Sequence, residues 1–228
     1  VAYDAAFAFE LAAIVRDGLR RMYEAGEDVF YYLSLYNQDY AQPAKPEGSD
    51  EGILKGLYRF RRSASSAKTR AQLLGSGVIL LQALRAQEIL AEQFEVAAGV
   101  WSATSRPQRR NEALGCERCN RLHPGEPSKV PYVTQQLERA TGRVLAGWDS
   151  IKAVPDMIGR FVNRRYVPLG TDGFGRSDTR EELRRYFEVD AAHIAVAVLS
   201  ALFDEGKLPA ATVRQAIADL KLDPDAPE

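Results

Sequence analysis

Apolar residues recur at intervals of three and four along several stretches of the chain, a pattern that predicts amphipathic helices. Near the beginning we expect a helix almost from the first residue to residue 26, with an apolar face formed by Phe7, Leu11, Ile14, Val15, Leu19 and Met22. Two further helices are predicted over residues 78–94 and 190–206. Their core-facing residues are Leu80, Leu84, Leu90 and Phe94 in the first, and Ala191, Ile194, Ala195, Val198 and Leu202 in the second. Shorter helices are predicted over residues 112–122, 131–140, 150–162, 178–187 and 209–222.

Between these helices lie short runs rich in apolar, β-branched and aromatic residues, which are typical of strands. They cover residues 27–37, 53–63, 70–77, 96–104, 144–149 and 164–172, and the first of them, EDVFYYLSLYN, is predicted to be buried. Strands that alternate with helices favour an α/β architecture. We therefore predict a three-layer α/β fold, in which helices flank a mixed and largely parallel sheet.

A stretch rich in proline, glycine and polar residues divides the chain. Residues 41–52, AQPAKPEGSDEG, contain Pro43, Pro46 and two glycines, a composition typical of a linker. We predict that residues 1–42 are the end of one domain, that residues 43–52 are a linker, and that residues 53–228 form a second domain. The chain opens without a methionine in a helical pattern, so we also expect it to be a piece of a longer protein.

Composition and charge exclude some classes of function. Hydrophobic residues make up 46% of the 228 residues and charged residues 27%, as in ordinary globular proteins. Thirty basic and 31 acidic residues leave a net charge of -1, whereas a general nucleic-acid surface carries a basic excess. The longest apolar run, residues 191–203, is too short to span a bilayer. We therefore expect a protein that binds neither nucleic acid nor a membrane.

The two cysteines and two histidines are candidates for metal or redox chemistry. Cys116 and Cys119 form a C-x-x-C pair, and His123 follows four residues later. A structural zinc site needs about four ligands, so a carboxylate would have to complete it. Arginines around the pair favour thiolates, but no second cysteine pair exists, and two incidental thiols are the favoured interpretation. His193 lies in an apolar helix and is expected to be packed and hydrogen-bonded, while His123 is suited to a helix end.

The glycine-rich segment LGTDGFGRSD, residues 169–178, is a candidate phosphate-binding loop. It has neither the lysine of a P-loop nor the G-x-G-x-x-G spacing of a dinucleotide loop. Ser177 or Asp178 is predicted to cap the following helix, with Asp178 and Glu181 forming a capping-box variant. We interpret the segment as a structural loop in which the glycines make a sharp turn, Phe174 fills the space between elements, and Arg176 forms a surface ion pair. The loop comprises Asp172, Gly173, Phe174, Gly175, Arg176, Ser177 and Asp178.

Several of these segments together resemble one enzyme family. The segment LGTDGFGRSDTREELRRYFEVDA is similar to the carboxy-terminal signature of the homodimeric bacterial pyruvate dehydrogenases, the first, decarboxylating components of the pyruvate dehydrogenase complex. The resemblance covers essentially the whole chain, in the same order and spacing. It also rests on VAYDAAFAFELAAIVRDGLRRMYE, NQDYAQPAKPEG, EGILKGLYRF, QLLGSG and CERCNRLHP.

The resemblance implies a function for the parent protein. Members of the family are similar to transketolase, have three α/β domains, and use thiamine diphosphate and Mg²⁺ to decarboxylate pyruvate and acetylate the lipoyl group of the dihydrolipoyl acetyltransferase. By this likeness residues 1–42 end the pyrimidine-binding domain, and residues 53–228 are the transketolase-like carboxy-terminal domain, which is mainly architectural. The resemblance implies a cytoplasmic homodimer. No catalytic, cofactor-binding or metal-binding residue is carried over, because those of the family lie upstream of Val1, so the chain alone is expected to be inactive.

One stretch is expected to approach the active site of the parent. Tyr36, Asn37 and Gln38 follow the last strand of the pyrimidine-binding domain, and we predict that they form the rim of the substrate entrance. Leu35 and Tyr36 stand in the region where transketolases carry an arginine that holds a sugar phosphate, which suits a substrate without phosphate. Cys119 lies where the family has tryptophan, which argues further against a metal site.

Three other functions stay open at this point. A stand-alone α/β module would bind a nucleotide or anion beyond the carboxyl ends of its strands, at a topological switch point. A zinc or redox module would use Cys116 and Cys119. A relative within the same family would accept another 2-oxo acid.

Overall fold

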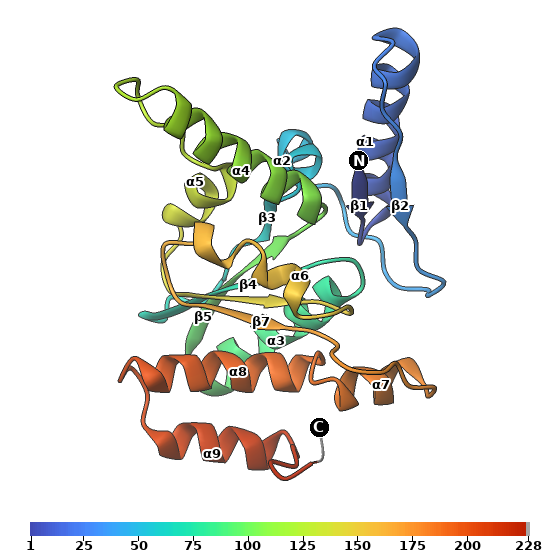
Figure 1. The fold of residues 1–228 in the computed structure, drawn as a ribbon. Coiled ribbons are helices and arrows are strands. Elements are labelled where there is room, and N and C mark those ends of the chain that lie inside the picture. Colours follow the sequence, from blue (N-terminus) through green and yellow to red (C-terminus); the bar gives the residue numbers. More distant parts are fainter. Residues whose placement is uncertain (227–228) are drawn as a thin grey trace.

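A computed structural model describes residues 1–226 of the chain. Strands are labelled β1 to β7 and helices α1 to α9 in Figure 1, and a π-helical turn and a 3-10 turn add two short elements. In chain order the elements are β1 (Ala2–Asp4), α1 (Ala8–Leu19), the π turn Arg20–Glu24, β2 (Tyr32–Ser34), α2 (Asp50–Lys55), β3 (Tyr58–Arg61), β4 (Thr69–Gly75), α3 (Ile79–Phe94), β5 (Val96–Ser102), α4 (Arg106–Leu122), α5 (Tyr132–Glu138), β6 (Arg143–Gly147), α6 (Ala153–Asp156), the 3-10 turn Gly159–Phe161, β7 (Tyr166–Leu169), α7 (Arg180–Tyr186), α8 (Ala191–Asp204) and α9 (Ala210–Asp219).

The main sheet has five strands in the order β3-β5-β4-β6-β7. Strands β4, β5, β6 and β7 are parallel to one another, and β3 pairs with β5 in the antiparallel sense. A separate two-stranded parallel sheet joins β1 and β2. The main sheet is therefore mixed and largely parallel, which confirms the prediction.

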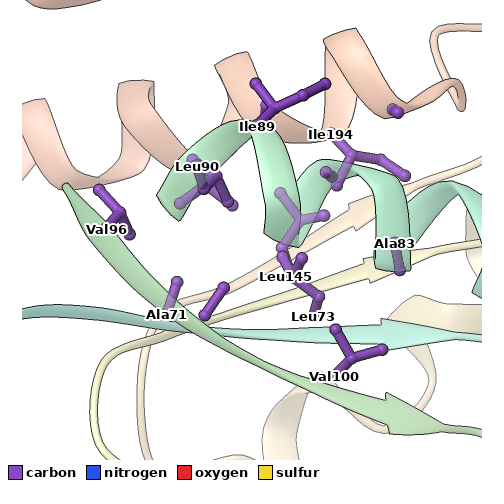
Figure 2. Packing of buried hydrophobic residues seen from close by; sticks show 14 of the residues in the cluster. Ala71, Leu73, Ala83, Ile89, Leu90, Val96, Val100, Leu145 and Ile194 are labelled. Carbon is purple, nitrogen blue, oxygen red and sulfur yellow. The ribbon is translucent and has the colours of Figure 1, made fainter. Parts of the chain in front are cut away.

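Helices cover both faces of this sheet. On one face, α3 and α8 pack together over β4, β5 and β6, and α9 lies outside α8 (Figure 1). Apolar side chains from both layers, including Leu73, Leu90, Val100, Leu145 and Ile194, pack together there (Figure 2). The predicted core faces of residues 78–94 and 190–206 are confirmed. On the other face, α4 and α5 cover a second cluster that contains Trp101 and Trp148, which completes the three layers.

The first forty residues differ from the prediction. The chain begins with β1 rather than with helix, and α1 starts only at Ala8. Of the predicted α1 face, Phe7 and Ile14 are buried, whereas Val15 and Leu19 are exposed. The predicted buried strand over residues 27–37 is reduced to β2, whose neighbours Phe30 and Leu35 are exposed. Tyr3 and Leu33 of the two-stranded sheet pack in a small cluster with Ile14 of α1, whereas Phe30 and Leu35 beside β2 remain exposed.

Several other boundaries move because caps and glycines override the apolar pattern. Helix α2 begins at Asp50, inside the predicted linker, and ends at Gly56, whose φ of 90° suits a glycine cap, so the strand predicted over residues 53–63 shrinks to β3. Helix α4 begins at residue 106, six residues earlier than predicted, because the Ser105 side chain accepts from the main-chain N–H of Gln108. Residues 150–162 form only α6 and the 3-10 turn.

The helical run Arg180–Asp204 is long and apolar enough, by composition, to cross a membrane. It is divided in the structure, because α7 ends at Tyr186, Glu188 adopts a φ of 56°, and α8 starts at Ala191. The apolar stripe of α8 packs against α3 and the sheet. Core packing therefore accounts for the apolar composition of this run.

Candidate functional site

The carboxyl ends of strands β4 and β6 mark a topological switch point. From β4 the chain crosses through α3 to β5 on one side, and from β5 it crosses through α4 and α5 to β6 on the other side of β4. In open α/β sheets such a crevice is the usual place for a ligand. Here the segments Ser76–Val78 and Trp148–Ser150 border it, and the question is what occupies it.

Asp4, at the end of β1, lies in this crevice with 6% of its surface exposed. Its carboxylate accepts hydrogen bonds from the Tyr36 hydroxyl (2.6 Å) and the Ser76 hydroxyl (2.6 Å). The guanidinium of Arg106, at the first position of α4, lies 3.5 Å from the same carboxylate. The Asp4 main-chain N–H donates to the carbonyl of Thr104 (2.8 Å). One residue of the first segment is thus bonded to the segments that follow β4 and β5.

Tyr36 also lies in the crevice. Its ring lies against Gly77, where a Cβ atom would overlap the ring, so this turn requires a residue without a side chain. Gly77 also adopts a φ of 48°, which glycine tolerates best. Burial, and then the nearby carboxylates of Asp4 and Asp149, raise the pKa of Tyr36 far above its ordinary value. Tyr36 is therefore a neutral hydrogen-bond donor here.

A cation and a second carboxylate complete the cluster. The guanidinium of Arg106 stacks on the Trp148 ring, 3.5 Å from its centroid, and donates to the Ser150 hydroxyl (3.2 Å). Burial lowers the pKa of Arg106, and Asp4 opposes that change. Loss of hydration around the Asp149 carboxyl, together with the Asp4 charge, raises the pKa of Asp149. The cluster thus holds two carboxylates beside one stacked arginine, so the single positive charge of Arg106 does not offset both.

Glu10 forms a second polar anchor, deeper in the molecule. It is fully buried in α1 and accepts four hydrogen bonds, from the main-chain N–H groups of Ala6 (2.6 Å) and Phe7 (3.1 Å) and from the hydroxyls of Tyr58 (2.7 Å) and Ser102 (2.5 Å). Burial raises the pKa of Glu10 despite these donors. Every lone-pair direction of this carboxylate is used internally, so it is an anchor and not an acid–base group open to a substrate.

Asp4 and Tyr36 therefore occupy the crevice where it meets Ser76 and Gly77, and a cavity of about 400 Å³ bordered by Asp4 and Arg106 lies beside it. The carboxylates of the crevice repel an anion, and its hydroxyl donors already bind Asp4, so the position is unsuited to the nucleotide or anion predicted for a stand-alone module. Within residues 1–226 no group of three or more His, Cys, Asp or Glu side chains is placed to hold a metal ion. These residues do not fit a diphosphate–Mg²⁺ group either. Their hydrogen bonds instead attach residues 1–40 to the larger sheet. We call this set, Asp4, Glu10, Tyr36, Ser76, Ser102 and Arg106, the polar junction.

The other two residues of the predicted rim lie beside α7. The carbonyl of Asn37 accepts from Arg180, and the side-chain oxygen of Gln38 accepts from Arg184 (2.8 Å). The structure thus brings the segment of residues 36–38 next to the helix that follows the glycine-rich loop. A role as a substrate entrance stays a prediction for all three residues.

The glycine-rich loop is anchored at its start and open at its tip. The Thr171 N–H donates to the Ser150 carbonyl (2.9 Å), and the Asp172 carboxylate accepts from the Lys152 N–H (3.0 Å). Phe174 is 96% exposed, so the prediction that it fills the space between elements is wrong. Gly173 adopts a φ of 75°, and a Cβ atom added there would meet nothing within 4 Å, whereas Gly175 has an ordinary φ in equally open space.

The cap of α7 also differs from the prediction. Thr179 is the cap residue, and its hydroxyl accepts from the Glu182 N–H (3.3 Å), so Ser177, Asp178 and Glu181 do not form the predicted capping arrangement. The Asp178 carboxylate instead accepts from the Thr179 N–H (2.7 Å). Among residues 1–226 no carboxylate pairs with Arg176, which stacks on Tyr186 at 4.5 Å from the ring centroid. The predicted ion pair of Arg176 is therefore replaced by a cation–π contact.

The cysteines and histidines have structural surroundings. Cys116 is buried on α4 and its thiol donates to Glu112 (3.3 Å). Burial and then Glu112 raise the pKa of Cys116 to about 11, so the expectation that nearby arginines favour its thiolate is wrong. His123 is the residue at the end of α4, and His193 is hydrogen-bonded to Asp190 (2.8 Å), as predicted for both.

The residues of the polar junction were missed by sequence reasoning, apart from Tyr36. Asp4 and Glu10 carry one usable signal, because each is a carboxylate within a run of small and apolar residues, YDAAFAFEL. Such a residue is either exposed on one face or buried with partners, and the sequence does not decide between the two. Ser76, between two glycines in GSG, resembles any tight turn.

Comparison with known families gives two matches within the chain. Residues 56–190 match the family described as the transketolase-like TK C-terminal domain. Residues 1–43 match the middle domain of the pyruvate dehydrogenase E1 component. The polar junction therefore joins residues of one match, Asp4, Glu10 and Tyr36, to residues of the other.

Curated relatives confirm the resemblance found in the motifs. The chain is 43% identical over 228 residues to the pyruvate dehydrogenase E1 component of Cupriavidus necator, covering 100% of this chain and 26% of that protein. It is 47% identical over 225 residues to that of Mycolicibacterium smegmatis, covering 98% of this chain and 24% of that protein. The chain thus spans about a quarter of the length of these relatives.

Solved structures confirm the fold. A transketolase from Pichia stipitis superposes with a TM-score of 0.59 at 18% sequence identity, over 90% of this chain and 26% of that chain. A structure described as a split gene transketolase, inactive beta4 tetramer, gives a TM-score of 0.55 at 17% identity over 89% of this chain and 57% of that chain. At this level of identity the likeness concerns the fold alone.

Proposed function

We propose that this chain, which belongs to the transketolase-like C-terminal domain family, is the carboxy-terminal part of a pyruvate dehydrogenase E1 component. That enzyme depends on thiamine diphosphate. One observation carries the proposal: a middle-domain segment and a C-terminal domain occur in one chain and are fastened by the polar junction. The junction fixes the position of the C-terminal domain relative to the middle domain.

The parent protein decarboxylates pyruvate and reductively acetylates the lipoyl group of the dihydrolipoyl acetyltransferase. Thiamine diphosphate, bound with Mg²⁺ by domains outside this chain, supplies the electron-accepting chemistry of that reaction. The parent is a cytoplasmic homodimer. The residues of this chain orient the end of the middle domain, with Tyr36, Asn37 and Gln38 at the rim of the substrate entrance.

The role assigned to this chain is architectural. Its buried carboxylates are saturated by internal donors, and its switch-point crevice is occupied by Asp4 and Tyr36. The chain spans about a quarter of the length of its relatives, so we expect that this chain alone does not turn over pyruvate.

A chimera tests the proposal. The C-terminal quarter of the Cupriavidus necator relative is replaced by this chain, and pyruvate decarboxylation is measured with thiamine diphosphate and Mg²⁺. The chimera is expected to be active, whereas the truncated relative and this chain alone are expected to be inactive. Decarboxylation by the isolated chain would contradict the proposal, and so would a stable, cofactor-loaded chimera without activity.

The relative that accepts another 2-oxo acid is the second candidate within the family. The chimera separates a role of this chain in specificity from a purely architectural one. With an architectural role, the ratio of kcat/KM for pyruvate to that for 2-oxobutyrate stays at the value of the Cupriavidus necator protein. A changed ratio would assign substrate selection to residues of this chain, with Tyr36 as the first to be examined.

A further inference from the structure

Four arginines converge on a hollow at the amino ends of the parallel strands, whereas the polar junction lies at their carboxyl ends. The hollow has a volume of about 240 Å³ and lies at the amino ends of β4, β5 and β6, beside the end of α5. Gly99 and Gln72 form its floor, and Ser63 and Thr141 stand at its side. The arginines are Arg59, Arg62, Arg70 and Arg139. We call this set the arginine hollow.

None of the described residues that line the arginine hollow is acidic. Among residues 1–226, none of the four arginines forms a salt bridge, although Arg16, Arg61, Arg85 and Arg143 elsewhere all pair with carboxylates. The sequence contributes to this imbalance, because residues 52–87 contain no aspartate or glutamate. A balanced total charge of -1 thus conceals a local excess of positive charge.

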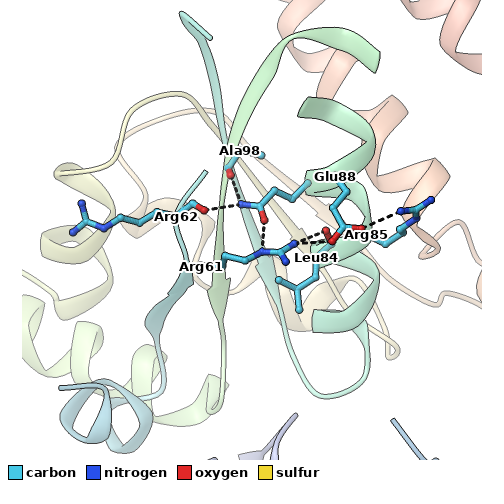
Figure 3. A network of polar contacts seen from close by, with 7 residues as sticks. Arg61, Arg62, Leu84, Arg85, Glu88 and Ala98 are labelled. Carbon is cyan, nitrogen blue, oxygen red and sulfur yellow. Dashed lines mark hydrogen bonds and ion pairs between the residues drawn. The ribbon is translucent and has the colours of Figure 1, made fainter. Parts of the chain in front are cut away.

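Two adjacent arginines, Arg61 and Arg62, have different surroundings. Arg61 points toward α3, where it donates to the Leu84 carbonyl (2.9 Å) and pairs with Glu88 (3.4 Å) (Figure 3). The side chain of Arg62 extends away from that network, while its carbonyl accepts from Gln87 (Figure 3). Strand β3 ends at Arg61, and its register against β5 shifts between Arg59 and Arg61, so Arg61 is bound on the α3 side while Arg59 and Arg62 line the hollow.

The floor of the arginine hollow is built and partly dehydrated. The guanidinium of Arg59 stacks on the Trp101 ring at 4.6 Å from its centroid, and its buried Nε–H has no acceptor. The Trp101 indole N–H donates to the Gln72 side chain (2.8 Å), which in turn donates to the Thr141 carbonyl (2.7 Å). Burial, followed by the charge of Arg62, lowers the pKa of Arg59. A buried N–H without an acceptor and like charges held close together both favour the binding of an anion at this place.

We propose that the arginine hollow binds an oligophosphate, a ligand in which two phosphate groups are linked. Guanidinium groups form paired hydrogen bonds with phosphate oxygens, so four of them match the oxygens of two linked phosphates. The hollow is smaller than the roughly 300–1,000 Å³ typical of sites that enclose a drug-sized ligand, so the diphosphate group is held and any attached group remains outside. The site lies away from the polar junction and does not depend on the proposed function.

Calorimetric titration of the full 228-residue chain with inorganic pyrophosphate, without Mg²⁺, tests the proposal. Arg62 and Arg139 are exposed, so the double variant Arg62→Gln/Arg139→Gln is expected to fold as the unchanged chain does. Its dissociation constant is expected to rise by about tenfold or more for each guanidinium removed, because each loses charge-assisted hydrogen bonds. The matched control, Arg118→Gln/Arg214→Gln, removes the same charge from exposed arginines elsewhere and is expected to leave the constant within about twofold.

The outcomes are distinguishable. No measurable binding by the unchanged chain overturns the proposal, as does equal weakening in the control variant, which would indicate general charge attraction. Arg70→Gln, also at an exposed position, provides a second test if the double variant loses thermal stability. Titration with ADP distinguishes two sources of the diphosphate group. If ADP binds at least as tightly as pyrophosphate, the ligand is a nucleotide that carries the diphosphate. If pyrophosphate binds more tightly than ADP, the ligand is free pyrophosphate. Tighter binding of a hexaglutamate peptide than of either would overturn the ligand class.

Discussion

Glu10 illustrates how burial and hydrogen bonding oppose each other at a single residue. Four donors surround its carboxylate, yet the loss of hydration outweighs them and raises the pKa. A group whose pKa is higher in the folded than in the unfolded state favours folding when protonated. Its contribution to stability is complete below the ordinary carboxyl value of 4.5 and is lost as the pH rises through the folded-state pKa.

Glu10→Gln tests this sign. The amide oxygen can keep the Ala6 and Phe7 N–H groups, while the amide N–H group donates to the Tyr58 and Ser102 hydroxyls, which rotate to accept. The stability of the variant relative to the unchanged chain is therefore expected to increase as the pH rises above about 4.5, measured by urea unfolding. Glu24→Gln, at an exposed position, is the control and should show no such trend. A difference that is flat with pH would contradict the role of burial at Glu10.

At the scale of elements, the turns and caps decide where the helices and strands end. The glycine-rich loop between β7 and α7 is the clearest case, because its two middle glycines differ in conformation although the sequence treats them alike. Gly173 has a φ of 75° and Gly175 does not, and a Cβ atom added at either position would meet no atom within 4 Å outside its chain neighbours. Any cost of a side chain at Gly173 thus arises from the backbone and not from crowding.

Gly173→Val is expected to lower the free energy of unfolding by about 1–2 kcal/mol, because an L residue in the left-handed region places its Cβ against the carbonyl. Gly175→Val is the matched control and is expected to change it by less than about 0.5 kcal/mol. Thermal and chemical unfolding of the two variants measure the difference. In the full parent enzyme, we expect Gly173→Val to impair folding or dimerisation more than thiamine diphosphate affinity. Equal effects of the two substitutions would show that the conformation of Gly173 does not limit stability.

At the scale of the whole molecule, the polar junction makes two family segments into one body. The segments also share apolar contacts, since Phe7 stacks on Phe60 at 5.1 Å between ring centroids and belongs to the main core. Hydrogen bonds from Asp4 and Glu10 add direction to this packing, because each donor has to lie at a defined position around a carboxylate. The carboxyl ends of the parallel strands thus attach the first segment to the C-terminal domain. The arginines of the hollow, which lack carboxylate partners among residues 1–226, lie at the amino ends.

Asp4→Asn is expected to lower the free energy of unfolding by about 1–3 kcal/mol, because the buried end of Arg106 loses its carboxylate partner. Urea unfolding followed by circular dichroism measures this loss. Asp28→Asn removes a charge from an exposed position of the same segment and should have little effect. If the Asp4→Asn variant were as stable as the Asp28→Asn control, the Asp4 carboxylate would not contribute to the stability of the polar junction.

Local patterns in the sequence determined much of the fold. The apolar stripes of α3 and α8, the strands β4 to β7 and their alternation with helices follow from short-range periodicity, and the three-layer sheet follows from that alternation. The motifs also led to the correct family. These features were accessible because the spacing of apolar residues along a helix or strand reports directly which face is buried.

Only the tertiary structure decided which polar residues matter. Asp4 meets Ser76 across 72 positions and Glu10 meets Ser102 across 92, and no local pattern records such pairs. The same holds for the exposure of Phe174 and for the convergence of Arg59, Arg62, Arg70 and Arg139, which come from three separate segments. The physical reason is that a polar side chain is stable either in water or among partners, and the topology that brings distant strand ends together determines which of these it finds.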